Sequence, residues 1–181
     1  MENKIYAVYN EKTIRVYQAY NDAIADEALK LGTFGKKFKM NRMTWIKPSF
    51  LWMMYRSGWA AKDNQTRVLA IDIQRQGFDY IVNNSILSIF SKEVYGTIEH
   101  WEKLLKKSEI RCQWDPDRDI FGRPLKRKAI QLGIKGSITK RYINEWIVSI
   151  TDITKSVKDI KIAIIEKKFS DTMLPVEHEY I

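Results

Sequence analysis

The segment over residues 41–62 constrains the fold most, because it joins large apolar side chains to basic ones. It contains three of the chain's six tryptophans, Trp45, Trp52 and Trp59. Proline is tolerated at the start of a helix, where its missing N–H would have no partner. Pro48 therefore predicts a short strand over 42–46 and a helix over 49–57. This helix is apolar on nearly all sides, which is typical of a buried helix, so the chain has to build a core around it.

The composition predicts a single domain over residues 1–181. Apolar residues make up 45% of the chain and charged residues 29%, as in ordinary folded proteins. No signal-peptide pattern and no apolar run of the roughly 20 residues that a membrane span needs is visible, so we expect a cytoplasmic protein without a membrane partner. One cysteine, Cys112, and two histidines match no recognised zinc spacing, so we expect no metal.

Hydrophobic periodicity predicts interleaved strands and helices. We expect strands over 4–10, 13–20, 42–46, 67–74, 109–114 and 127–134, and helices over 22–31, 49–57, 77–90, 97–107, 137–150 and 152–168. Residues 115–125 are expected to form a loop, and the tail over 174–181 to be extended. Because strands and helices do not alternate regularly, the pattern indicates an α+β fold with a twisted mixed or antiparallel sheet packed against helices.

The net charge of +9 favours an anionic partner such as nucleic acid, since clustered cations release the counterions of a polyphosphate. Two clusters of basic residues stand out, one formed by Lys36, Lys37, Lys39 and Arg42 and the other by Arg123, Lys126, Arg127 and Lys128. The alternative is a solvated basic surface that keeps the protein in solution.

Two glutamines interrupt otherwise apolar strands. A buried amide is costly unless its donors and acceptors have partners, so Gln18 and Gln131 either satisfy each other or face a ligand. Lys47 and Ser49 flank Pro48 at the junction between strand and helix, where the free N–H groups of a helix N-terminus attract phosphate. A simple N-cap is the alternative role for Ser49.

Most standard catalytic signatures are absent. The chain has no dinucleotide-binding glycine motif after a strand, no phosphate-binding loop and no nucleophile elbow. Asp115, Asp117 and Asp119 alternate and offer oxygens for Mg²⁺, but the glycine and distal glutamate of a calcium loop are missing. The pattern favours a turn in which Asp115 caps its own backbone and Arg118 pairs with a neighbouring carboxylate.

Six segments carry a family resemblance that spans nearly the whole chain. They are TIRVYQAYNDAIADEA, RMTWIKPSFLWMMYRSGW, VLAIDI, QWDPDRD, AIQLGI and INEWIVSITDIT. In these segments the chain resembles the bacterial and fungal family called domain of unknown function 4291. The tryptophan-rich segment is the most specific of the six, but this resemblance implies no particular activity.

A more distant resemblance is to the ADP-ribosyltransferase superfamily, whose members bind NAD in the cleft of a split, twisted sheet. The segment VYQAY resembles their first element, TWIKPSFLWM their second and AIQLGI their third. The resemblance implies catalytic positions at Gln18, Ser49 and Gln131, where the family has His or Arg, Ser, and Glu or Gln. It also implies cofactor contacts from Arg15, Tyr17, Thr44, Lys47 and Arg56.

Two functions from different classes are therefore expected. The first is an ADP-ribosyltransferase-like enzyme that binds NAD or a related nucleotide and acts on a nucleic acid or another anionic partner. The alternative is a nucleic-acid-binding module without catalysis, in which the basic clusters contact phosphates and exposed aromatic rings stack on bases.

Overall fold

The computed structural model describes residues 3–181 and has an α+β fold, as predicted. A three-stranded antiparallel sheet has the order β2-β4-β8, with bounds Thr13–Tyr20, Arg67–Gln74 and Ile147–Asp152. A four-stranded mixed sheet has the order β3-β7-β6-β5, with bounds Thr44–Ile46, Pro124–Ile134, Ile110–Arg118 and Ile86–Leu87. A third, two-stranded sheet pairs β1 (Tyr6–Ala7) with β9 (His178–Glu179).

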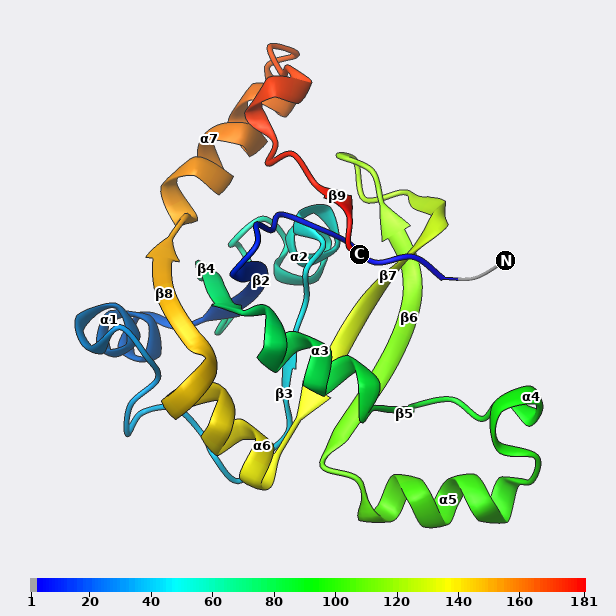
Figure 1. The fold of residues 1–181 in the computed structure, drawn as a ribbon. Coiled ribbons are helices and arrows are strands. Elements are labelled where there is room, and N and C mark those ends of the chain that lie inside the picture. Colours follow the sequence, from blue (N-terminus) through cyan, green and yellow to red (C-terminus); the bar gives the residue numbers. More distant parts are fainter. Residues whose placement is uncertain (1–2) are drawn as a thin grey trace.

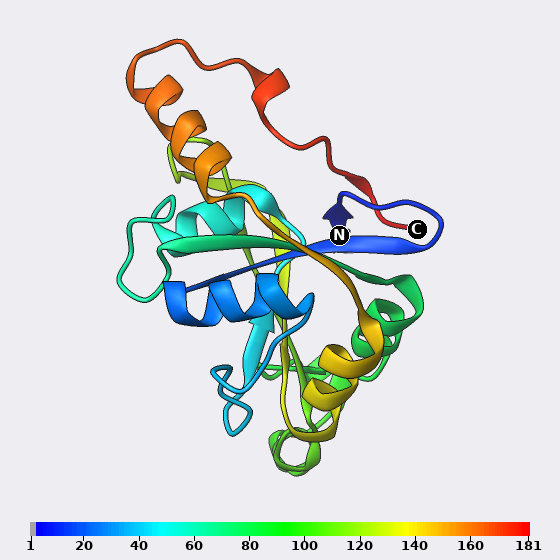
Figure 2. The ribbon, with the colours of Figure 1, turned by 90° about the vertical axis from the view of Figure 1, so that its left-hand side faces the viewer.

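A backbone bridge joins the two larger sheets. The backbone N–H of Tyr17 in β2 donates to the carbonyl oxygen of Lys47, directly after β3, at 2.7 Å. Figure 2 shows the strands of the three-stranded sheet running across the view, while β3 and β7 run down it. The sheets therefore cross at β2 and β3.

Seven α-helices surround the sheets in the described part of the chain. Their bounds are α1 Asp22–Leu31, α2 Phe50–Ser57, α3 Arg75–Asn83, α4 Lys92–Tyr95, α5 Ile98–Lys107, α6 Gly136–Arg141 and α7 Thr154–Ile165. A π-helical turn, Tyr142–Trp146, continues α6, and a short 3₁₀ turn, Asp171–Met173, precedes the C-terminal segment. Figure 1 shows α7 at one end of the molecule and the pair α4 and α5 at the other.

Alternating side chains of β2 divide the core in two, because successive residues of a strand point to opposite faces. Ile14 and Val16 belong to a cluster with β4, α1, α3 and β7. Tyr17 belongs to a second cluster, in which α2 and α7 pack on the other face of the sheet. Gln18 therefore points to the opposite face from Tyr17, and this separation decides which residues can share a site.

Capping explains why the helices begin and end where the sequence predicts. The side chain of Asn21 accepts from the N–H of Ile24 at the start of α1, and Gly32 follows its end with φ 71°. The side chain of Ser49 accepts from the N–H of Trp52 at the start of α2, and Gly58 follows with φ 59°. The predictions for both helices are confirmed to within a residue.

Three predicted elements differ from the structure. Residues 147–150 are not helical, because Ile147–Asp152 pairs with β4 as strand β8. Residues 115–118 are not a loop, because β6 continues to Arg118 opposite β7. The third predicted helix ends at Asn83 instead of residue 90, because Ile86–Leu87 pairs in parallel with β6. In each case pairing between distant strands overrides the local pattern.

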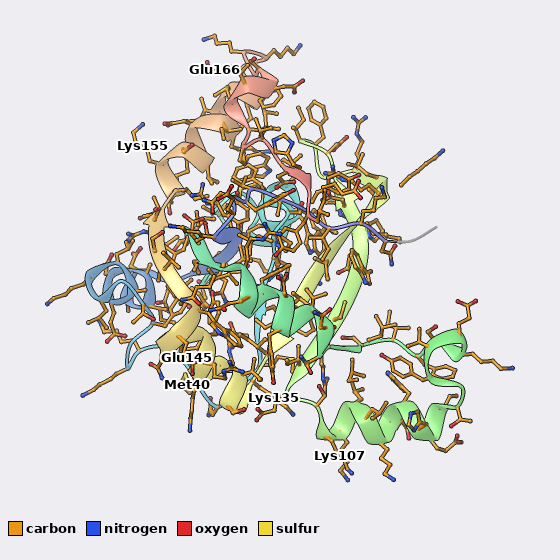
Figure 3. All side chains as sticks on the ribbon, viewed as in Figure 1. Met40, Lys107, Lys135, Glu145, Lys155 and Glu166 are labelled. Atoms are coloured by element: carbon orange, nitrogen blue, oxygen red, sulfur yellow. The ribbon has the colours of Figure 1, made fainter. Side chains whose placement is uncertain are left out.

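Two further expectations also require correction. The strand expected over 4–10 is shorter in the structure, because β1 covers only Tyr6–Ala7 and pairs with β9, while Tyr9 forms an isolated antiparallel bridge with Ile14 of β2. The predicted inward face of α5 contains no buried residue, and Ile98 is exposed. Figure 3 shows Lys107, at the end of α5, at the lower edge of the molecule near Lys135. None of the described helices is both long and apolar enough to span a bilayer.

Candidate functional site

The space between the two crossing sheets forms a cavity of about 590 Å³. Its lining includes three cations, Arg42, Lys47 and Arg56, and five amides, Gln18, Asn64, Gln65, Gln113 and Gln131. No carboxylate is among its lining residues. A volume between about 300 and 1,000 Å³ is typical of sites for small molecules and cofactors. Cations and amide donors without acids are suited to an anionic ligand.

Gln18 lies at the back of this cavity and is fully hydrogen-bonded within the protein. Its amide nitrogen donates to the hydroxyls of Tyr20 and Thr44, each at 2.8 Å. Its amide oxygen accepts from the hydroxyl of Tyr142 at 2.8 Å. Burial raises the pKa of both tyrosines, that of Tyr20 to about 12. The two glutamines therefore do not satisfy each other, and Gln18 anchors β2 to β3 and to the π-helical turn.

Lys47 lies directly after β3 and faces the cavity with 6% of its surface exposed. Its ammonium group donates to the carbonyl oxygen of Trp45 at 3.1 Å and pairs with no carboxylate of residues 3–181 within ion-pair distance. Burial, with a smaller contribution from the neighbouring Arg56, lowers the pKa of Lys47 to about 7. Near neutral pH this side chain is therefore divided between its charged and neutral forms.

Gln131 holds a carboxylate that the sequence analysis did not assign to the site. Gln113 and Gln131 are directly opposite each other on β6 and β7, and both line the cavity. The amide of Gln131 donates to Asp115 at 2.6 Å, and that of Gln113 donates to the same carboxylate at 2.9 Å. Asp115 follows Gln113 by two residues on one strand, so both lie on one face of the sheet. A predicted strand that continued past residue 114 would have placed Gln113 and Asp115 on the same face.

Ser49 does not line the cavity. Its hydroxyl caps α2 and donates to Asp117 at 2.8 Å, and Asp117 also accepts two bonds from Arg127. The N-terminus of α2 already has an anionic partner, since the N–H of Phe50 donates to Glu177 at 2.6 Å. Burial raises the pKa of Glu177 to about 7. The free helix N-terminus expected from the sequence is thus occupied by the protein's own C-terminal segment.

The five expected cofactor contacts fall into two groups. Thr44, Lys47 and Arg56 line the cavity between the sheets. Arg15 and Tyr17 lie on the other face of β2 and line a different cavity of about 290 Å³ beside α7. Arg15 is also engaged there, because its guanidinium donates two bonds to Asp72. The structure therefore brings together Gln18, Thr44, Lys47, Arg56 and Gln131 of the predicted site.

The two basic clusters lie on different sides of the molecule. Lys36 and Lys37 belong to the loop between α1 and β3, which Met40 marks in Figure 3, whereas the turn between β6 and β7 lies at the opposite side. Arg123 pairs with Asp119, and Arg127 pairs with Asp117 and covers the ring of Tyr6. Lys126 and Lys128 are the exposed lysines of that cluster.

The three alternating aspartates bind separate partners and do not converge on one point. Asp115 accepts from Gln113 and Gln131, and Asp119 caps the turn by accepting from the N–H groups of Phe121 and Arg123. The prediction that Asp115 caps its own backbone is wrong, because its carboxylate accepts from the two glutamine side chains instead. Arg118 does not pair with a carboxylate either; it donates to the carbonyl of Gly122 and lies 3.9 Å from the ring centre of Tyr55. Within residues 3–181 no group of three or more metal-binding side chains comes together.

Comparison with known proteins identifies the family. No curated protein and no solved structure matches the chain. The profile of the family described as "Domain of unknown function (DUF4291)" matches residues 4–180, which is nearly the whole sequence. The chain therefore belongs to the DUF4291 family.

Proposed function

We propose that the cavity between the sheets binds a nucleotide, with NAD as the first candidate, and that the protein is a transferase resembling ADP-ribosyltransferases. One observation carries the proposal: Gln18, Lys47 and Gln131, which come from three distant segments, line one cavity together with two arginines and no carboxylate. The crossing of two sheets at one backbone bridge provides the split on which such a cleft depends.

The residues of the cavity suit the parts of such a ligand. Arg42, Lys47 and Arg56 would neutralise phosphate, since guanidinium and ammonium groups form strong charge-assisted bonds with its oxygens. Trp45 offers an aromatic face, and Gln65 and Asn64 offer donors and acceptors for hydroxyl groups. The residues present therefore fit a nucleotide better than a neutral apolar ligand.

Asp115 does not line the cavity, but two lining amides hold its negative charge beside it. Bound NAD would supply the ADP-ribosyl group. A carboxylate held in a fixed position stabilises positive charge that develops nearby, and the amides of Gln113 and Gln131 hold Asp115 at 2.9 and 2.6 Å. Asp115 would thereby take the place that the absent glutamate of the last strand leaves open, with Gln131 as its positioning residue. The net charge of +9 favours an anionic acceptor such as a nucleic acid.

Isothermal titration calorimetry with NAD tests the binding. We expect Arg56→Ala to weaken the affinity by about tenfold or more, because a charge-assisted contact contributes roughly 1.5 to 3 kcal/mol. Lys62→Ala is the matched control, since Lys62 is exposed close to α2 but does not line the cavity. Absence of NAD binding at millimolar concentration would overturn the proposal.

Chromatographic measurement of nicotinamide release tests the transfer step. Asp115→Asn preserves the shape of the side chain and removes its charge, so we expect NAD still to bind and nicotinamide release to fall. The assignment of Asp115 is wrong if this variant releases nicotinamide as fast as the wild-type protein does.

A further inference from the structure

A second, smaller cavity adjoins the first one. It measures about 240 Å³ and shares four lining residues with the larger cavity, Tyr20, Arg42, Thr44 and Asn64. Its volume lies below the range of about 300 to 1,000 Å³ that is typical of a pocket for a complete ligand. The two cavities are therefore best understood as two chambers with a common wall, each holding one part of an elongated ligand.

The small chamber has its own chemistry. Tyr20, Ile24 and Phe38 are its aromatic and apolar lining residues, Asn21 adds an amide and Lys39 a cation. Tyr20 and Phe38 pack edge to face with ring centres 5.8 Å apart, which fixes the position of both rings. No carboxylate lines this chamber. Such a lining suits a flat heterocycle that carries an anionic substituent.

Arg42 belongs to the wall that the two chambers share. It precedes β3 and is exposed, and it forms no ion pair with any carboxylate of residues 3–181. The planar fork of a guanidinium matches two phosphate oxygens at once. An anionic group that links two ring systems would therefore meet Arg42 between the chambers.

We propose that the ligand is a dinucleotide whose diphosphate binds Arg42. One nucleoside occupies the small chamber, with its base against Phe38 and Tyr20. The other occupies the large chamber beside Gln131, because only this chamber has the amides that hold Asp115. This inference rests on the proposed function and specifies the class of nucleotide and its orientation: the adenosine half of NAD lies in the small chamber and the nicotinamide half in the large one.

Calorimetry with NAD and with its two halves, AMP and nicotinamide mononucleotide, tests the inference. We expect NAD to bind at least tenfold more tightly than either half, and Arg42→Ala to weaken NAD by about tenfold or more. Ile24→Trp, which fills the small chamber, should weaken NAD and AMP at least tenfold and leave nicotinamide mononucleotide unchanged. Lys39→Gln should weaken the same two ligands by a smaller factor.

Control variants distinguish a failure of this inference from a failure of the proposed function. Lys36 lies in the same loop as Lys39 but lines neither chamber, so we expect Lys36→Gln to change none of the three affinities. The inference is overturned, with the proposed function intact, if NAD binding responds to Arg56→Ala but not to Arg42→Ala, Ile24→Trp or Lys39→Gln. Both proposals are overturned if none of the three nucleotides binds. Lys39 is exposed, so its substitution tests the chamber even if Ile24→Trp lowers the thermal stability.

Discussion

At the scale of single residues, the burial of Lys47 lowers the stability of the folded protein. Its pKa is about 7 in the folded protein against an ordinary value of 10.5. The unfolded chain therefore binds more protons between these values, and stability rises with pH through this window. We predict that Lys47→Met raises the free energy of unfolding on the order of 5 kcal/mol below pH 7, with the gain shrinking towards pH 10.5. Thermal unfolding at several pH values measures this, and a gain that does not change with pH would contradict the assignment.

Gln18 and Gln131 have the same amide group but different roles: Gln18 joins three hydroxyl groups, and Gln131 holds a carboxylate. Gln18→Leu leaves the hydroxyls of Tyr20, Thr44 and Tyr142 without their common partner, so we predict a loss of about 3 kcal/mol in unfolding free energy. Gln131→Leu removes one bond to the Asp115 carboxylate, which keeps Gln113 as a partner, and should cost about 1.5 kcal/mol. Denaturant titration compares the two variants. Equal losses would mean that the network around Gln18 is not the junction that we describe.

At the scale of elements, the C-terminal segment contacts α2 through Glu177, whose carboxyl group accepts a hydrogen bond from the N–H of Phe50 at the start of that helix. Burial raises its pKa from 4.5 to about 7, Asp117 adds to this effect and Arg127 opposes it. The unfolded chain loses this proton first, so stability falls as pH rises from 4.5 to 7. Glu177→Gln keeps the acceptor and removes the ionisation.

We therefore predict that Glu177→Gln melts at a higher temperature than the wild-type protein, and that the difference grows from pH 4.5 to pH 7 and then levels off. Differential scanning calorimetry across this range provides the measurement. Glu179→Gln is the control, because Glu179 lies two residues further along and pairs with Lys4 at the surface. The same pH response in both variants would show that burial at the N-terminus of α2 is not the cause.

At the scale of the whole molecule, the sequence pattern predicted those elements whose ends depend on residues close by in the chain. The caps of α1 and α2 and the extent of β4 follow from residues within each element. Pairing between distant segments could not be seen in this way: Ile147–Asp152 has a helical pattern but completes a sheet, and β1 finds its partner at the other end of the chain.

The candidate site shows the same division. Gln18 and Gln131 stood out because amides interrupt apolar strands, and both do line one cavity. The resemblance to ADP-ribosyltransferases implied that Ser49 and Tyr17 lie beside them. Because side chains alternate along β2, Tyr17 points to the face opposite Gln18, and the hydroxyl of Ser49 donates to Asp117. Asp115 was missed as part of this site because its partners come from the strand pairing of β6 with β7.

The distribution of charge over the whole surface predicts weak and salt-sensitive contact with nucleic acid. Because the loop before β3 and the turn between β6 and β7 lie on different sides, a single strand meets only the lysine pair Lys36 and Lys37 or the pair Lys126 and Lys128. Two phosphate contacts give a slope of about −1.4 for log affinity against log salt, or a loss of about sevenfold between roughly 50 and 200 mM. Fluorescence anisotropy with a single-stranded oligonucleotide measures this slope, and replacing either lysine pair by glutamine should remove only the contribution of that side. A loss of about a thousandfold over the same range would instead require about seven contacts and would support a continuous nucleic-acid-binding face.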